Sequence, residues 1–453
     1  MSAAKWPENH SRSKALYDRA TKVMPGGITR ILPWQEPFPV YAGSGSGAYV
    51  TDVDGTRRLD LLNNFASLIH GHAHPAIVAA IQEQVTKGTA FTLPTEPEVA
   101  LAETVCERAE SFEWIRFSNS GTEAVMCAIK AARAFTGRSK IVKCEGVYHG
   151  SYDYAEVSLD SSPENWGDDP KSTGYSKGVP EGVKNDVVVI PFNNVEAAER
   201  IILANRYAIA AILIDPAPSY FGFVPVTQEF IQMIRRVSTE IGAVFILDEV
   251  ITFRVHRGGA QTRFNIKPDL TVLAKIIGGG FPVGAVAGLR SFMQVFDHRE
   301  GKPLLPWSGT FTANPITMTA GKICLDLYTQ AESDRLDVLG DRLRAGVTEA
   351  FAKAGFPGQV TGFSSMFMVF GHQREIADYR SGYSSKEESK WVTRLQRNLV
   401  LEGYHIAKTG KAFLSTVMTE ADVDGFIAAT EHAARQAVKE AAEGNEKRGA
   451  ALR

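Results

Sequence analysis

Residues 243–248 read AVFILD, a run of apolar residues that ends in a carboxylate. Four similar runs lie around it: DVVVIPF at 186–192, IAAILID at 209–215, LTVLAK at 270–275 and GAVAG at 284–288. Near-continuous apolar runs of this length are typical of strands that are buried on both faces of a sheet. The segment 227–241, between two of the runs, has the apolar spacing of a helix. This alternation predicts an α/β fold with a mainly parallel sheet.

The chain changes character after about residue 330. Its patterns there predict a helix at 334–353, a strand at 365–370, a helix at 386–402, a short strand pair within 403–416 and a helix from 420. This mixture indicates a smaller α+β domain. We therefore expect an N-terminal segment at 1–65 that contributes to the small domain and to the active-site entrance, a large domain at 66–328 and the small domain at 329–453.

The charge balance excludes some classes of partner. The 453 residues include 49 Lys and Arg against 51 Asp and Glu, which gives a formal charge of −2. Proteins that bind nucleic acids or acidic membranes usually carry a clustered basic excess, so neither partner is expected. A hydrophobic content of 44% is that of a globular protein and excludes general disorder.

The cysteines and the hydropathy pattern bear on the cellular compartment. The four cysteines are widely spaced and form no Cys-x-x-Cys pair, so we expect neither a disulfide framework nor a metal site. The sequence starts with a polar stretch that lacks the apolar segment of a signal peptide. No uninterrupted run of about 18 apolar residues occurs. We expect a soluble, cytoplasmic protein.

A group of small polar residues, SNSGT at 118–122, lies between a short apolar segment and a helical run that starts at Ala124. The N–H groups at the start of a helix, together with the helix dipole, favour a phosphate. Ser120, Gly121 and Thr122 are therefore candidate phosphate-binding residues. The same residues also fit an ordinary helix cap.

Three larger side chains lie at or after the ends of expected strands. Tyr148 follows the strand expected at 140–144, where its ring is able to stack on a flat ligand or only to pack. Asp248 ends the run at 243–248, at the edge where α/β sheets bind ligands, although a helix cap or a metal ligand are alternatives. Lys275 ends the run at 270–275. Burial there lowers the pKa of its amine and favours the neutral nucleophile, unless the ammonium reaches water.

Together, these features match one cofactor. A phosphate cradle, a stacking ring, a carboxylate for the pyridinium nitrogen and a lysine are what proteins use to hold pyridoxal 5′-phosphate (PLP). The glycines at 278–280 lack the G-x-G-x-x-G order, so a dinucleotide loop is not expected. The combination predicts a PLP enzyme.

The chain resembles the class III, fold-type-I PLP-dependent aminotransferases, and within them the glutamate-1-semialdehyde aminomutase-like branch. The resemblance extends from about Tyr17 to Ala429. Its motifs are MPGG at 24–27, TDVDG at 51–55, GHAHP at 71–75, SNSGTEA at 118–124, VYHG at 147–150, LDEV at 247–250, LAK at 273–275 and SGTFTANP at 308–315. It implies PLP fold type I, with a mainly parallel seven-stranded sheet in a large PLP-binding domain.

The resemblance also implies roles at matching positions. Lys275 holds the cofactor and then moves the substrate's α-proton, Asp248 pairs with the pyridinium nitrogen, and Tyr148 stacks on the ring. The phosphate is held at residues 120–122 and, from the neighbouring subunit, by Thr310. The implied assembly is a homodimer with shared active sites.

Substrate choice rests on the N-terminal loop and on departures from the family pattern. The stretch GGITR at 26–30, followed by PFP at 37–39, resembles the loop of β-amino-acid aminotransferases in which the residue at Arg30 binds a substrate carboxylate. A surface ion pair is the alternative for Arg30. Residues 215–220, DPAPSY, stand where the family has Glu-Pro-Val followed by an Asn, so Tyr220 is expected to take over the contact to the ring oxygen of the cofactor. The glutamate of the aminomutases is not found around 403–415.

We therefore predict an aminotransferase that moves an amino group from an amino acid, of the β- or D-series in the resembling enzymes, to a 2-oxo acid by ping-pong chemistry. The first alternative is a glutamate-1-semialdehyde 2,1-aminomutase, which uses the same lysine. A non-catalytic PLP-binding protein is a second alternative, and a racemase or a decarboxylase is a third, because the scaffold does not determine the reaction.

Overall fold

The computed structural model describes residues 5–451, with side chains up to residue 443, and the chain divides into two compact units. The first unit comprises residues 1–74, 335–374 and 384–453, and the second comprises residues 75–334 and 375–383. Residues 1–4, the start of the polar N-terminal stretch, lie outside the described residues.

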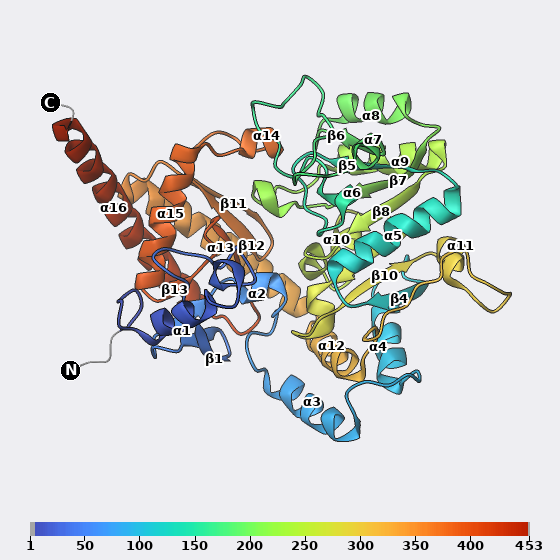
Figure 1. The fold of residues 1–453 in the computed structure, drawn as a ribbon, viewed down its shortest axis with the longest axis horizontal. Helices are drawn as coiled ribbons and strands as arrows, with labels where there is room; N and C mark the ends of the chain where they lie inside the picture. The colour runs from blue at the N-terminus through green and yellow to red at the C-terminus, as the bar shows by residue number, and fades with distance from the viewer. Residues whose placement is uncertain (1–4, 452–453) are drawn as a thin grey trace. The chain divides into compact units, whose positions relative to one another are not determined.

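The second unit is built on a seven-stranded sheet (Figure 1). In spatial order its strands are β4 (Trp114–Ser118), β10 (Gly284–Gly288), β9 (Leu270–Ala274), β8 (Val244–Asp248), β7 (Ile209–Ile214), β5 (Lys140–Cys144) and β6 (Val187–Ile190). β10 is antiparallel to both β4 and β9, and all the other neighbouring pairs are parallel. The mainly parallel, seven-stranded sheet predicted from the sequence is therefore confirmed.

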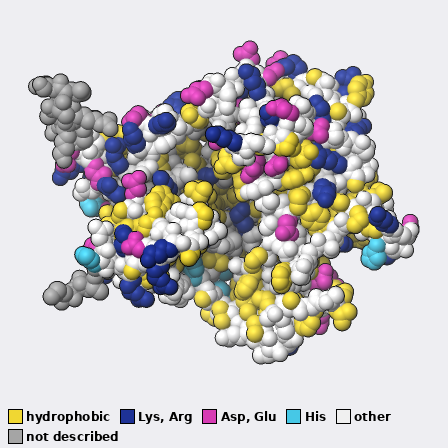
Figure 2. Space-filling model, in the orientation of Figure 1, with side chains coloured by type: hydrophobic (Ala, Val, Ile, Leu, Met, Phe, Trp, Pro, Cys, Tyr) yellow, Lys and Arg dark blue, Asp and Glu magenta, His cyan; other side chains and the backbone are white. Residues whose placement is uncertain are grey.

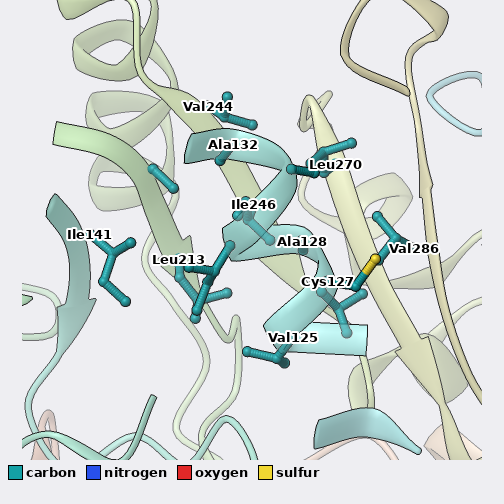
Figure 3. Packing of buried hydrophobic residues seen from close by; sticks show 14 of the residues in the cluster. Val125, Cys127, Ala128, Ala132, Ile141, Leu213, Val244, Ile246, Leu270 and Val286 are labelled. Atoms are coloured by element: carbon teal, nitrogen blue, oxygen red, sulfur yellow. The ribbon is translucent and has the colours of Figure 1, made fainter. Parts of the chain in front are cut away.

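The central strands are buried on both faces, as their apolar runs predict. Every residue of β7, β8, β9 and β10 is buried. Because side chains alternate along a strand, Val244 and Ile246 of β8 face helix α5 (Gly121–Thr136), and Phe245 faces the opposite side. Figure 3 shows Val125 and Ala128 of α5 packed against this side of the sheet. This packing of apolar side chains fixes α5 against the seven-stranded sheet.

Helices and short turns complete the second unit. The helices besides α5 are α3 (Pro75–Lys87), α4 (Glu96–Cys106), α6 (Asp153–Glu156), α7 (Glu181–Asn185), α8 (Val195–Ala204), α9 (Gln228–Ile241), α10 (Gly259–Arg263), α11 (Arg290–Met293), α12 (Pro315–Leu327) and α14 (Tyr379–Gly382). Helix α9, predicted from its apolar spacing, begins after Thr227, whose side chain accepts a hydrogen bond from the N–H of Phe230. Single turns of 3-10 helix lie at Ser219–Phe221, Thr252–Val255, Lys275–Gly278 and Gln294–Phe296.

The first unit contains two smaller sheets. One has the order β1 (Ala42–Ser46), β2 (Tyr49–Asp52), β3 (Arg57–Asp60) and β13 (Tyr404–His405), and the other has the order β11 (Gln359–Phe363), β12 (Met366–Phe370) and β14 (Lys411–Phe413). The strand pair expected within 403–416 is wrong in one respect. Both strands form, but β13 joins β3 and β14 joins β12, because each finds its backbone partner in a different sheet.

The helices of the first unit follow the predicted pattern at the C-terminal end. They are α1 (Arg12–Ala20), α2 (Asn63–Ala66), α13 (Gln330–Ala354, which starts in the second unit), α15 (Lys386–Leu401) and α16 (Glu420–Ala451). Helix α15 begins with a capping box between Ser385 and Glu388. Across residues 5–451, no helix combines the length and the apolar character that crossing a membrane requires. A turn of 3-10 helix lies at Pro25–Gly27.

Candidate active site

Three polar residues meet at one edge of the seven-stranded sheet. Asp215 follows β7, Asp248 ends β8 and Lys275 follows β9. These strands are parallel neighbours, so their carboxyl ends lie side by side at the edge where α/β proteins bind ligands. The structure therefore brings together Asp248 and Lys275, which the sequence analysis selected separately.

Lys275 has an unusual backbone and a perturbed amine. Its φ is +52°, a left-handed conformation that is uncommon for residues other than glycine. Burial lowers the pKa of its amine to about 8, although the negative charges of Asp248 and Asp215 act in the opposite direction. At pH 8 about half of the Lys275 side chains therefore carry the neutral, nucleophilic amine.

Asp248 is paired with a buried histidine. The carboxylate is 4% exposed, and its Oδ2 lies 2.7 Å from Nδ1 of His149. Its Oδ1 accepts a hydrogen bond of 3.0 Å from the N–H of Val250. Burial lowers the pKa of His149, against the raising effect of Asp248, which favours a neutral ring with its proton on the nitrogen that faces the carboxylate.

The other nitrogen of His149 is the clearest sign that a ligand belongs here. Nε2 of His149 is buried and has no hydrogen-bond partner among the described residues. Buried polar atoms in proteins are usually hydrogen-bonded, so an unpaired one calls for a water molecule or a ligand. From the sequence, His149 stood only within the VYHG motif, and its pairing with Asp248 was not predicted. The signal was its position next to Tyr148, at the end of a strand.

The two acidic residues at the end of β8, Asp248 and Glu249, have different hydrogen-bond partners. Glu249 is completely buried and turns away to accept hydrogen bonds from the N–H of Ala260, the N–H of Gln261 at 3.1 Å and the side-chain amide of Gln261 at 3.0 Å. Burial raises the pKa of Glu249 to about 7. Glu249 thus anchors the turn at the start of α10, and Asp248 is the member of the pair that remains at the sheet edge.

Asp215 adds a second buried carboxyl group that the sequence analysis did not select. It is 7% exposed and accepts a hydrogen bond of 2.9 Å from the N–H of Ala217. Burial and the nearby charge of Asp248 raise its pKa well above the ordinary value, while Lys275 lowers it. Its place at the end of the run at 209–215 was the available signal.

The start of α5 combines a helix cap with a possible anion cradle. Ser120 caps the helix, because its hydroxyl accepts a hydrogen bond of 3.1 Å from the N–H of Glu123. The N–H groups of Gly121 and Thr122 come before the first intrahelical hydrogen bond and point out of the helix end. A Cβ atom on Gly121 would lie 3.4 Å from Cβ of Ala274, the residue before Lys275. The predicted phosphate-binding residues are thus next to the lysine strand.

The loop after β5 also reaches this helix start. The hydroxyl of Thr122 accepts a hydrogen bond of 3.1 Å from the N–H of Ser151. Gly150 has a φ of +89°, and a Cβ atom there would lie 2.6 Å from the Thr122 hydroxyl oxygen. Glycine is therefore required for the loop to approach α5 so closely.

Tyr148 and Tyr220 lie against each other. Their ring centroids are 6.0 Å apart and their planes differ by 15°. Tyr148 is 41% exposed, so part of its ring is open to a ligand. Burial raises the pKa of Tyr220 to about 12, so its hydroxyl remains a hydrogen-bond donor at neutral pH. Figure 1 locates both loops by the strands β5 and β7 that precede them.

Two further predicted residues, Thr310 and Arg30, come from other segments of the chain. Thr310 is exposed, in the loop before α12. Arg30 belongs to the first unit, where Nη1 donates a hydrogen bond of 2.7 Å to Oδ1 of Asn64 and the guanidinium lies 5.9 Å from the ring centroid of Phe65. Residues 63–66 all have positive φ, from 48° to 72°, which makes α2 a left-handed turn.

Comparisons with known proteins place this geometry in a family. The family model of the class III aminotransferases matches residues 31–419. The chain is 39% identical over 369 residues to a glutamate-1-semialdehyde 2,1-aminomutase of Methanothermobacter thermautotrophicus, which covers 81% of this chain and 86% of that protein.

Two solved structures are also similar. An ω-transaminase of Sphaerobacter thermophilus is 47% identical, with a TM-score of 0.93 over 95% of this chain and 99% of that one. A β-phenylalanine aminotransferase of Variovorax paradoxus is 32% identical, with a TM-score of 0.83 over 93% of each chain. These likenesses confirm the predicted PLP fold type I. The chain belongs to the class III aminotransferases, a family of PLP-dependent enzymes, which confirms the family and the cofactor predicted from the sequence.

Proposed function

We propose that this chain is a homodimeric aminotransferase that moves an amino group from an amino acid to a 2-oxo acid. The chemistry would take place in the predicted PLP-binding domain, residues 66–328. The observation that carries the proposal is the placement of the Lys275 amine and the Asp248–His149 pair at one sheet edge, next to the start of α5.

The residues at this edge fit PLP. The N–H groups of Gly121 and Thr122, beside the Ser120 cap, suit the phosphate, and the partly exposed ring of Tyr148 suits the pyridine ring. The unpaired Nε2 of His149 offers a further polar contact. When bound, PLP withdraws electrons from the substrate carbon that loses its proton.

The protein groups supply the rest of the chemistry. Asp248 is buried and negatively charged, so it would keep the ring nitrogen of the cofactor protonated. His149 orients the Asp248 carboxylate. Lys275 would hold the cofactor, and its amine, when free, would take a proton from the substrate carbon that bears the amino group and deliver it to the cofactor carbon. The Tyr220 hydroxyl would donate a hydrogen bond to the ring oxygen of the cofactor.

The donor class rests on Arg30 and on the similar structures. A guanidinium is suited to a carboxylate, and Asn64 and Phe65 hold that of Arg30 in place while leaving it exposed. The ω-transaminase and β-phenylalanine aminotransferase named above support an amino donor whose amine is not on the α-carbon. We propose β-amino acids as the first donors to test and D-amino acids as the second, with ping-pong transfer to 2-oxoglutarate or pyruvate.

A homodimer is supported by the exposed apolar surface of the second unit. Figure 2 shows hydrophobic side chains gathered over α3 and the start of α4. The exposed ones there are Val78, Val85, Phe91, Leu93 and Val99. An apolar patch of this kind usually marks an interaction site. We propose that a second copy covers it and contributes Thr310 to the phosphate.

We also propose a cytoplasmic location. The cysteines of the described residues, Cys106, Cys127, Cys144 and Cys324, are all free thiols. Free thiols without disulfides are typical of a reducing compartment.

A second candidate function is that of a glutamate-1-semialdehyde 2,1-aminomutase. The observation in its favour is that the curated relatives at 34–39% identity carry this name. The glutamate that the aminomutases carry around 403–415 is not found here, which supports the aminotransferase. Both reactions use the lysine, so Lys275 does not separate them.

The separating experiment is a product assay with the PLP-loaded protein. A panel of α-, β- and D-amino acids is incubated with 2-oxoglutarate or pyruvate, and glutamate 1-semialdehyde is incubated without any acceptor. We expect amino transfer that depends on the added 2-oxo acid. Isomerisation of glutamate 1-semialdehyde alone, with no transfer from the panel, would establish the aminomutase. Absence of both reactions, with PLP bound, would favour a non-catalytic protein.

A further inference from the structure

Residues 375–383, here called the arm, belong to the second unit, although the chain on both sides belongs to the first. The arm contains the short helix α14, which begins with a capping box between Asp378 and Ser381. Its side chains contact the two segments that carry Tyr148 and Tyr220. The proposed mechanism gives the arm no role.

The segment that carries Tyr148 and His149 is a closed loop. This loop, residues 145–161, leaves the sheet after β5 and is closed near its base, where the N–H of Gly146 donates a hydrogen bond of 2.8 Å to the carbonyl of Ser158. Lys143 of β5, completely buried, donates a second one of 2.7 Å to the carbonyl of Val157. The base of the loop is thus attached to the sheet.

Two side chains of the arm, Arg380 and Tyr379, also bond to the two ends of this loop. Nε of Arg380 lies 2.6 Å from Oε2 of Glu145, a buried carboxylate whose Oε1 accepts a hydrogen bond of 2.8 Å from the Ser161 hydroxyl. Arg380 also donates to the carbonyl of Gly167 at 2.7 Å, and the hydroxyl of Tyr379 donates to the carbonyl of Ser161 at 2.7 Å. Without Arg380, the carboxylate of Glu145 would lose this ion pair and remain buried, which is costly.

The arm also packs against the segment of the second tyrosine. The Tyr379 ring fills the space beside Gly146, where a Cβ atom would lie 1.9 Å from Cδ2 of Tyr379. The same ring meets Phe221, the residue after Tyr220, with centroids 6.4 Å apart and planes at 71°. A Cβ atom on Gly382 would lie 2.8 Å from Cβ of Phe221. The arm therefore touches both segments whose tyrosines stack on each other.

We propose that Arg380 and Tyr379 are positioning residues, which hold the loop at 145–161 and the Tyr220 segment so that Tyr148 and His149 are ready to receive the cofactor. The inference rests on the proposed function for the identity of the ligand. Side chains held by packing and outer hydrogen bonds bind more tightly because less order is lost on binding.

The test compares four variants with the wild-type chain. Arg380→Ala removes the ion pair, Tyr379→Phe removes one hydroxyl and Arg380→Lys keeps the charge. Arg236→Ala, which removes an exposed ion pair with Glu199 in the same unit, is the matched control. Hydrogen–deuterium exchange is measured without PLP, and the dissociation constant of PLP is then measured by absorbance titration.

For Arg380→Ala we expect faster exchange confined to residues 145–161 and the 219–221 turn. We expect a PLP dissociation constant raised about 10-fold and a kcat/KM lowered by up to about 100-fold. Tyr379→Phe should act less strongly in the same direction, and Arg380→Lys should recover part of the loss. Exchange and PLP affinity equal to those of Arg236→Ala, or faster exchange spread over the whole second unit, would overturn the proposal. A wild-type chain that binds no PLP would instead overturn the proposed function and leave the exchange comparison valid.

Discussion

The sheet edge of the second unit and the Arg30 loop of the first unit present charged groups in opposite ways. At the edge, Asp248 is 4% exposed and hydrogen-bonded to the buried imidazole of His149. Lys275 directly follows the buried strand β9. Arg30 is exposed and relies on Asn64 of a left-handed turn. The proposed function accordingly assigns the reaction to the buried edge and the choice of substrate to the exposed loop.

Replacing the edge lysine should have the largest effect. In the proposed function, Lys275→Ala would remove both the cofactor attachment and the proton acceptor, so we expect kcat for amino transfer to fall about 1000-fold or more. The exposed Lys267→Ala is the control and should leave the rate unchanged. Equal rates in the two variants would show that the edge is not the reacting centre.

The two acidic neighbours of β8 allow a sharper comparison. Asp248→Asn keeps the shape and removes the charge at the edge, so we expect kcat to fall about 100-fold with little change in stability. Glu249→Gln disturbs three hydrogen bonds inside the fold, so we expect it to lower the free energy of unfolding by about 2 kcal/mol and to change kcat little. Steady-state kinetics and urea unfolding of both variants measure this, and the reverse pattern would contradict the assignment.

Arg30 should act on substrate affinity. Losing a charge-assisted hydrogen bond to a carboxylate costs about 2 kcal/mol, so Arg30→Ala should raise KM for the amino donor about 30-fold while kcat changes little. Arg342→Ala, which removes an exposed ion pair with Asp424 in the same unit, is the control. If kcat fell and KM did not change, the division between edge and loop would be wrong.

The pH dependence should be the smallest effect. In the proposed function only the neutral amine of Lys275 would react with PLP, and burial lowers the pKa of this amine to about 8. Raising the pH from 7 to 9 therefore raises the neutral fraction of the amine about 10-fold. The rate of covalent PLP attachment to the PLP-free protein should rise by the same factor and reach a plateau above about pH 9. Stopped-flow absorbance measures this rate. A rise of about 100-fold without a plateau would indicate an unshifted lysine.

Much of the second unit could be predicted because its signals are local. The apolar runs before Asp248 and Lys275 predict buried parallel strands, and parallel strands place their carboxyl ends together. The small residues before α5 predict a helix start, and Ser120 does cap it. The sheet edge and the start of α5 could therefore be predicted from the sequence as parts of one site.

The remaining contacts depend on tertiary structure. Neither the bond between His149 and Asp248 nor the turning away of Glu249 has a local signature, because each depends on loops that are distant in sequence. The left-handed turn that holds Arg30 runs against the backbone preferences of Phe65 and Ala66, although Asn63 and Asn64 tolerate it, and is imposed by the surrounding fold. The strands β13 and β14 likewise find partners that their sequence does not indicate.

The most direct measurement of the central claim is the location of covalently bound PLP. The PLP-loaded protein is reduced with borohydride, digested and analysed by mass spectrometry. Lys143 is a built-in competitor, because burial lowers its pKa to about 7, but its amine is completely buried and donates a hydrogen bond to Val157. We predict one cofactor mass per chain, on the peptide that contains Lys275. No adduct, or an adduct on Lys143 or on a surface lysine, would contradict the account.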